Sequence, residues 1–154
     1  MPTKNNIFKK TAKGALLMSI LVSVGVMALI VTLTIPYLRK YQPNLKLNGA
    51  ARELTTDLRY AQQLTITEQI IHIVELDILN DSYKILKIDA ATTTVKQNNF
   101  PSEVSFQQIT GLTDDQVVFN SYGGVSESGE IILVNTSGAT AIINVKPSGY
   151  VELQ

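Results

Sequence analysis

The side chains that could carry out chemistry are few, and they do not form a recognisable catalytic set. His72 is the sole histidine and there is no cysteine, so a multi-histidine metal site, a Cys-ligated zinc site and a thiolate nucleophile are excluded. His72 stands between isoleucines in a stretch with the alternation of a β-strand. We therefore expect an ordinary strand residue there rather than a general base.

Two further groups are candidates for ion binding or catalysis. Asp114 and Asp115 could join loop carbonyls in a Ca²⁺ site, but no loop has the EF-hand pattern, so we expect turn-forming or solvated carboxylates. The stretch 123–126, Gly-Gly-Val-Ser, has only a superficial likeness to a nucleophile elbow, and we expect a turn there. Walker A, Gly-x-Gly-x-x-Gly and His-Glu-x-x-His motifs are absent from the sequence. The sequence predicts no enzyme, no metal and no cofactor.

Charge is distributed unevenly along a chain of 154 residues whose formal net charge is zero. Residues 1–14 hold four lysines and no acid, residues 15–36 hold no charge, and residues 70–154 hold four lysines against ten acids. An acidic C-terminal body repels phosphate, so a nucleic-acid partner is disfavoured. Two matches to the N-glycosylation tripeptide, at Asn80 and Asn135, are of a kind that is common by chance.

The uncharged segment determines the class of the protein. Residues 15–35 form an apolar stretch that, as a helix, would extend roughly 31 Å, close to the hydrocarbon thickness of a bilayer. It is longer than the apolar region of a secretory signal, and no Ala-x-Ala cleavage site follows it. The preceding Lys9, Lys10 and Lys13 favour a cytoplasmic N-terminus and an exported body. The sequence therefore predicts a single membrane-spanning helix.

A helical stem is expected after this segment. Pro36 should end or bend the first helix and Pro43 should interrupt it again, because proline lacks a backbone donor. From about Leu47 the helical period resumes. The predicted apolar stripe comprises Leu47, Ala51, Leu54, Leu58, Ala61 and Thr65, with Arg52, Glu53, Asp57, Arg59 and Gln63 mostly off it. Such a stripe should pack on the chain's own C-terminal body.

The remainder of the chain is typical of short strands joined by turns. A hairpin is predicted from strands 70–79 and 83–88 around Asn80-Asp81-Ser82. Further strands are predicted at 92–96, 104–108, 116–119, 130–135, 139–145 and 150–153. The fold class is α+β, with a long N-terminal helix packed on an antiparallel sheet or small β-sandwich. The predicted segments are a basic leader (1–14), a transmembrane helix (15–36), an amphipathic stem (37–69) and a β-rich domain (70–154).

The pattern Lys13-Gly14, then an uncharged helix, then Pro36, resembles the leader of type IV pilins and type II secretion pseudopilins. The stem from Asn48 through Gln62 and the C-terminal glycines at 123, 124, 129 and 149 are similar to GspH/FimT-type minor pseudopilins. The resemblance implies cleavage after Gly14 by a prepilin peptidase and methylation of Ala15, the new N-terminus. It also places Pro36 as the twenty-second mature residue, where the family usually has proline.

The resemblance also implies a structural role, with one departure from the family pattern. Family members normally carry Glu as the fifth mature residue, and this chain has Ser19, which favours a tip or low-copy position over an abundant shaft position. The assembly helix would pack through small residues, among them Ser19, Ser23, Gly25 and Ala28. The implied partners are the membrane, other pilin or pseudopilin subunits, the prepilin peptidase and an assembly platform.

Three functions remain open from the sequence. The first is a minor pilin or pseudopilin of a type IV pilus or type II secretion-like filament, residing first in the inner membrane with its N-terminus inside. The second is the major pilin of a thin filament. The third is an uncleaved single-pass anchor whose β-domain binds an extracellular ligand.

Overall fold

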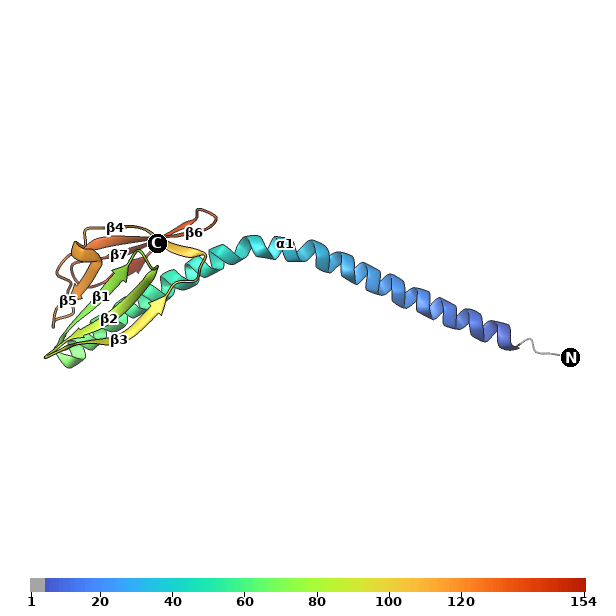
Figure 1. Cartoon of the computed structure of the whole chain (residues 1–154), viewed down its shortest axis with the longest axis horizontal. Coiled ribbons are helices and arrows are strands. Elements are labelled where there is room, and N and C mark those ends of the chain that lie inside the picture. The colour runs from blue at the N-terminus through green and yellow to red at the C-terminus, as the bar shows by residue number, and fades with distance from the viewer. Residues whose placement is uncertain (1–4) are drawn as a thin grey trace. The chain divides into compact units, whose positions relative to one another are not determined.

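The computed structural model describes the backbone of residues 5–154 and the side chains of residues 16–35 and 41–154. Its elements are one long helix and eight strands, consistent with the expected α+β class (Figure 1). The chain divides into two compact units, Met1–Tyr41 and Gln42–Gln154. The first unit is helical. The second combines the C-terminal part of the helix with all the strands.

Helix α1 extends from Asn5 to Glu68 without a break in helical conformation. The helix therefore does not end at Pro36, one of the two effects expected there, and the predicted interruption at Pro43 is wrong. A proline removes one hydrogen bond and crowds one carbonyl, at a cost of about 3 kcal/mol, but the turns on either side remain intact. The apolar face from Leu47 onward buries enough surface to offset such a local loss.

The strands form two antiparallel sheets of four strands each. The first sheet has the order β3-β2-β1-β5 and is built from β1 (Ile71–Asp77), β2 (Ser82–Ile88), β3 (Thr92–Asn99) and β5 (Gln116–Phe119). The second has the order β4-β6-β7-β8 and is built from β4 (Val104–Thr110), β6 (Gly129–Asn135), β7 (Thr140–Val145) and β8 (Val151–Leu153). A short 3-10 turn, η1 (Thr113–Asp115), precedes β5. All eight predicted strands are confirmed, and the β1–β2 hairpin is paired as expected.

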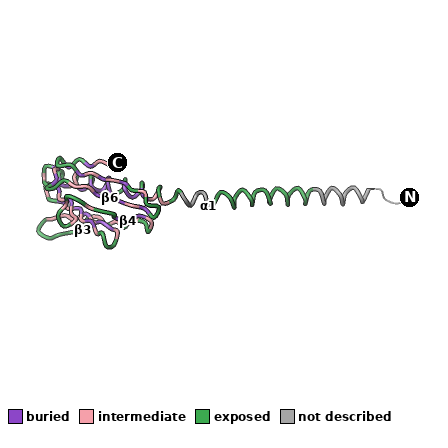
Figure 2. Tube along the Cα trace, turned by 90° about the horizontal axis from the view of Figure 1, so that it is seen from above, coloured by how far each residue is buried: buried purple, intermediate pink, exposed green. Residues whose placement is uncertain are grey.

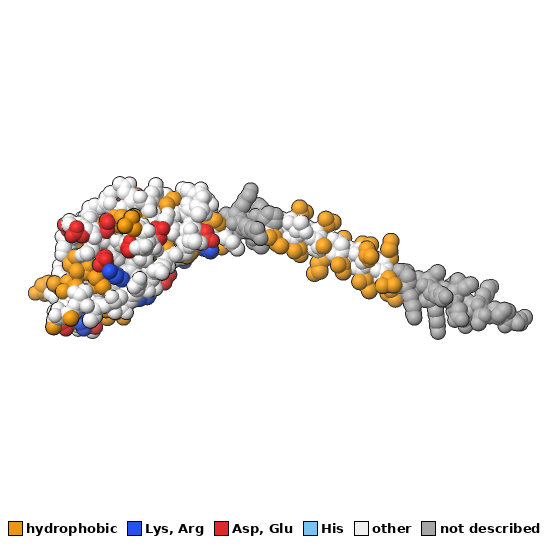
Figure 3. Space-filling model, in the orientation of Figure 1, with side chains coloured by type: hydrophobic (Ala, Val, Ile, Leu, Met, Phe, Trp, Pro, Cys, Tyr) orange, Lys and Arg blue, Asp and Glu red, His pale blue; other side chains and the backbone are white. Residues whose placement is uncertain are grey.

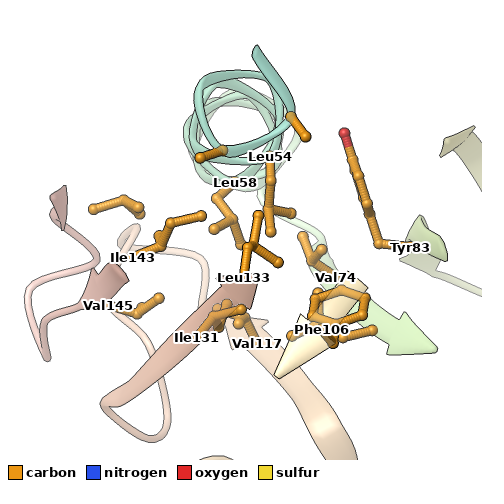
Figure 4. Packing of buried hydrophobic residues seen from close by; sticks show 14 of the residues in the cluster. Leu54, Leu58, Val74, Tyr83, Phe106, Val117, Ile131, Leu133, Ile143 and Val145 are labelled. Carbon is orange, nitrogen blue, oxygen red and sulfur yellow. The ribbon is translucent and has the colours of Figure 1, made fainter. Parts of the chain in front are cut away.

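The core lies between the helix and the inner faces of both sheets. All six residues of the predicted stripe are buried, with Ala51, Leu54, Leu58, Ala61 and Thr65 fully so. Leu54 and Leu58 point from the helix into side chains of both sheets, including Val74 and Leu133 (Figure 4). Buried positions alternate along β1 and β6. Figure 2 shows the buried residues gathered inside the β-rich unit. One core therefore joins the helix to both sheets.

Turn chemistry sets the register of the first hairpin. The Asp77 carboxylate accepts hydrogen bonds from the backbone N–H groups of Leu79 and Asn80, at 3.1 and 3.0 Å, which is an Asx turn. Asp81 then adopts a positive φ of 46°, a conformation that Asp tolerates better than most residues. The same Asp81 accepts the backbone N–H of Phe106 in β4, so this turn also connects the two sheets.

We predict that acid destabilises the second unit. Hydrogen bonds from Lys87 and Lys46 hold the pKa values of Glu68 and Glu103 below their ordinary value of 4.5. A carboxyl whose pKa is lower in the folded state contributes stability above pH 4.5, and that contribution is lost as the pH falls through the lowered value. The urea midpoint of unfolding should decrease between about pH 5 and pH 3, a range that brackets the ordinary pKa values of carboxyl groups. Glu103→Gln should show a smaller decrease, and a midpoint that rises on acidification would contradict the prediction.

Candidate assembly helix and its supporting junction

The N-terminal part of α1 exposes apolar side chains around its whole circumference. Leu16–Ile35 is the one segment, among the described residues, that is long and apolar enough to cross a membrane. None of it is buried (Figure 3). Even the least exposed of its large apolar side chains, Ile35, is 46% exposed. A helix that is apolar on every side is stable only in lipid or against another apolar surface.

Hydroxyl groups within this segment bond to the helix itself. Ser23, Thr32 and Thr34 donate to the carbonyls of Ser19, Ala28 and Ile30, at 2.9, 2.7 and 2.8 Å. These bonds satisfy donors that would be costly to leave unpaired in hydrocarbon. Gly25 has no atom close to the position that a side chain would occupy. A neighbouring helix could therefore approach this face closely.

Several of the predicted site residues lie outside the part of the chain whose side chains the structure describes. They are the orientation lysines Lys9, Lys10 and Lys13, the processing pair Gly14 and Ala15, and Pro36. Ser19 and Gly25 are described and lie in the exposed apolar segment. The assignments to leader, cleavage and assembly therefore stay predictions.

In the second unit, the C-terminal end of α1 is attached to strand β8 and to the loop that follows β5. Arg59 donates to the carbonyl of Val151 at 2.8 Å, and Gln62 donates to the carbonyl of Gly123 at 2.7 Å. The turn that precedes β8 touches the loop that follows β5, because a Cβ added to Gly149 would lie 1.9 Å from the Gly123 carbonyl oxygen. The stretch 123–126 is thus part of a structural junction, as the expected turn implies.

A buried polar network holds the middle of the helix to the first sheet. Asp57 is only 4% exposed, although the helical pattern placed it off the apolar stripe. Its carboxylate accepts from the Tyr83 hydroxyl (2.7 Å), from Lys96 (2.7 Å) and from Asn98 (2.9 Å). Burial, and the hydrogen bond to Asp57, raise the pKa of Tyr83 far above its usual value of 10, so this phenol stays protonated. The network therefore fixes the helix against β2 and β3.

The remaining candidates from the sequence take structural positions. His72 is fully buried in β1, with Nδ1 3.0 Å from the carbonyl of Ile70 and Nε2 3.8 Å from Glu68. Asp114 and Asp115 form the η1 turn, and no cluster of three metal-binding side chains occurs among the described residues. Asn135 is buried and donates to Asn44, so its amide is not free to accept a glycan.

Comparison with solved structures identifies the fold. The minor pseudopilin EpsH of the type 2 secretion system of Vibrio cholerae aligns with a TM-score of 0.62 at 12% identity, covering 71% of this chain and 96% of that one. The type IV minor pilin FimU of Pseudomonas aeruginosa aligns with a TM-score of 0.58 at 15% identity, covering 74% and 92%. No family model and no curated protein matches the sequence. The chain has the pilin-like fold that its resemblance implied.

We predict that Gly149→Ala disrupts the junction. Gly149 has a φ of 78°, and the added methyl group would collide with the Gly123 carbonyl. Gly138 is a matched control, because its φ is 81° and nothing lies within 4 Å of its missing Cβ. Gly149→Ala should cost about 3 kcal/mol or more in the free energy of unfolding, against about 1–2 kcal/mol for Gly138→Ala. Equal losses in urea unfolding would show that the two loops do not touch.

We also predict that Asp57→Ala is strongly destabilising. The change leaves Lys96 without its carboxylate and removes the acceptor of the Tyr83 hydroxyl. The expected cost is about 2–4 kcal/mol in the free energy of unfolding. Glu53→Ala serves as the control one turn away, because the Glu53 side chain is exposed and accepts a hydrogen bond from Asn98 at 3.0 Å. A cost for Asp57→Ala no larger than that of Glu53→Ala would contradict the network.

Proposed function

We propose that this chain is a structural subunit of a pilin-type filament, and specifically a minor pilin or pseudopilin. The observation that carries the proposal is the pairing of a fully exposed apolar helix, Leu16–Ile35, with a second unit that has the fold of minor pseudopilins and minor pilins. Before assembly, lipid covers the apolar surface of such a helix. In a filament, neighbouring helices at the centre would cover the same surface. The subunit performs no reaction of its own.

The first step is insertion with the N-terminus inside the cell and the β-rich unit exported. Lys9, Lys10 and Lys13 retain the N-terminus on the cytoplasmic side through the positive-inside bias. A prepilin peptidase then cuts between Gly14 and Ala15, and the new N-terminus is methylated. The mature chain would begin directly at the apolar segment, so no charged side chain would precede the assembly helix.

Assembly then depends on packing rather than on a buried charge. Ser19 occupies the position where relatives carry a carboxylate expected to pair with a neighbouring N-terminal amine. A carboxylate in the bilayer would cost roughly 2.5–3.5 kcal/mol on insertion scales, so the helix with Ser19 is more stable in the membrane. The same change removes one attraction between the subunit and its filament neighbour. This balance favours a tip or low-copy subunit. The partners are other pilin or pseudopilin subunits and the assembly platform.

Two alternatives make different predictions about the mature protein. A major pilin of a thin filament would be the most abundant protein in filaments sheared from cells. An uncleaved anchor that presents the β-rich unit to an extracellular ligand would keep residues 1–14. The location of the final filament, on the cell surface or in the periplasm, follows from which system the subunit serves.

We predict that the chain isolated from its native membrane begins at methylated Ala15. Intact-mass measurement and the N-terminal peptide test this directly. Gly14→Val should keep the leader, because the family that the leader resembles is cut after a glycine. Gly25→Val, within the apolar segment, is the control and should be processed normally. A wild-type chain that begins at Met1 would refute the proposal in favour of the uncleaved anchor.

A further inference from the structure

The ring of His72 combines complete burial with an unpaired nitrogen. Among the described residues, its Nε2 is the one buried side-chain nitrogen or oxygen that has no hydrogen-bond partner. The side chain is 0% exposed and belongs to the inner face of β1. Nδ1 lies 3.0 Å from the carbonyl of Ile70, and a carbonyl only accepts, so Nδ1 carries the proton of the ring. Nε2 is then a bare lone pair, and the geometry is that of a neutral imidazole.

The charged groups around the ring come from the elements packed against it. Helix α1 supplies Glu68, whose Oε2 lies 3.8 Å from Nε2. Strand β2 supplies Lys87, which is the ladder partner of His72 and whose Nζ lies 2.7 Å from the same Oε2. On the other side, β5 supplies the uncharged Phe119. Asp89, after β2, is a further charged group near Glu68.

A proton on Nε2 would place a charge and a new donor where no described side chain lies within hydrogen-bond distance. Glu68 does not compensate for this charge, because the oxygen that faces the ring is already bonded to Lys87. The Glu68 side chain is also 34% exposed, so solvent screens it. Such a carboxylate gives much less stabilisation than the burial of a charge removes. The folded unit therefore disfavours the protonated ring.

The connection between α1 and β1 is the part of the chain next to this ring that can open. Gln69 links the two elements with a φ of 56°, and it is exposed. Its side chain donates to the carbonyls of Ile66, at 2.7 Å, and Ser121, at 3.3 Å. This one residue thus joins the end of the helix to the start of β1 and to the loop after β5. Opening such an exposed connection gives water access to a charged ring without unfolding the rest of the unit.

We propose that His72 is a proton-sensitive latch. With a neutral ring, the start of β1 stays packed against the end of α1, and protonation of the ring in mildly acidic solution opens this connection. The opened or unfolded chain takes up the proton near pH 6.5, the ordinary value for histidine, whereas the closed state has no place for it. The closed state therefore has its full stability above this pH and loses stability as the pH falls below it.

The latch is a property of the second unit alone. It depends neither on cleavage of the leader nor on filament assembly, so its failure is distinguishable from failure of the proposed function. Its pH range also lies above the range in which the carboxyl groups Glu68 and Glu103 are expected to act.

The first test is urea unfolding of the full chain in detergent at about pH 7 and pH 5.5. Excluding one proton from the folded state should raise the equilibrium constant of unfolding up to roughly eightfold between these values. His72→Phe should lose this pH dependence. The matched control adds Ile71→His to His72→Phe, which moves the sole histidine to a position that is 44% exposed on the opposite face of β1. This double variant should be as insensitive to pH as His72→Phe.

The second test needs no substitution. The sole histidine gives one set of ring signals in the nitrogen NMR spectrum of the wild-type chain labelled at histidine. At about pH 7.5 we expect a protonated Nδ1 and an unprotonated Nε2. At about pH 5.5, amide exchange corrected for its intrinsic pH dependence should accelerate more at residues 69–73 than in β6 and β7.

Three results would overturn the proposal. An equal pH dependence in the wild type and in His72→Phe would assign the effect to other groups. A wild-type chain that becomes more stable between pH 7 and pH 5.5 would show that Glu68 holds the charged ring, and Glu68→Gln should then abolish the gain. Exchange that accelerates equally in 69–73, β6 and β7 would show that the whole unit opens rather than a latch.

Discussion

The fold of the second unit depends on one packing constraint, which is that a single helix face must serve both sheets. The fully buried residues Leu54 and Leu58 lie where the inner faces of the two sheets meet (Figure 4). Each sheet must cover its apolar face, and the two sheets and the helix share one cluster of buried apolar side chains. Residues 42–68 of α1 therefore act as the structural centre of this unit rather than as an appendage to it.

Apolar packing fixes the helix against the sheets but does not define its position along its own axis. That position is set by polar contacts at separate points along the helix. Asp57 binds β2 and β3 in the middle. Nearer the C-terminal end, Arg59 binds β8 and Gln62 binds the loop after β5. A shift by one residue would break all of them together, leaving a buried carboxylate without donors. The polar contacts thus supply specificity to an interface whose energy comes from apolar burial.

Periodicity in the sequence was sufficient to predict the elements and the apolar stripe, because both sheets and the helix bury one face each. Periodicity could not predict the burial of Asp57, because aspartate is usually exposed. Its burial depends on the tertiary partners Tyr83 and Lys96. It also could not predict the helix through Pro43, where local propensity is overridden by packing on the next turn. The turn at 123–126 was expected from its residues, but not what these junction glycines contact. Their physical reason, contact between two loops distant in sequence, is visible only in three dimensions.

The two units require different surroundings, and this difference constrains what the protein can do. The second unit buries its apolar residues internally, whereas the segment Leu16–Ile35 buries none of them. The hydroxyls of Ser23, Thr32 and Thr34 bond within their own helix, so this segment has no charge and few free donors with which to select a partner. Transfer from lipid to a helical bundle then exchanges one apolar environment for another, with a small net free energy per residue. Selectivity among neighbours must therefore come from the shape of the small-residue face and from the surface of the β-rich unit.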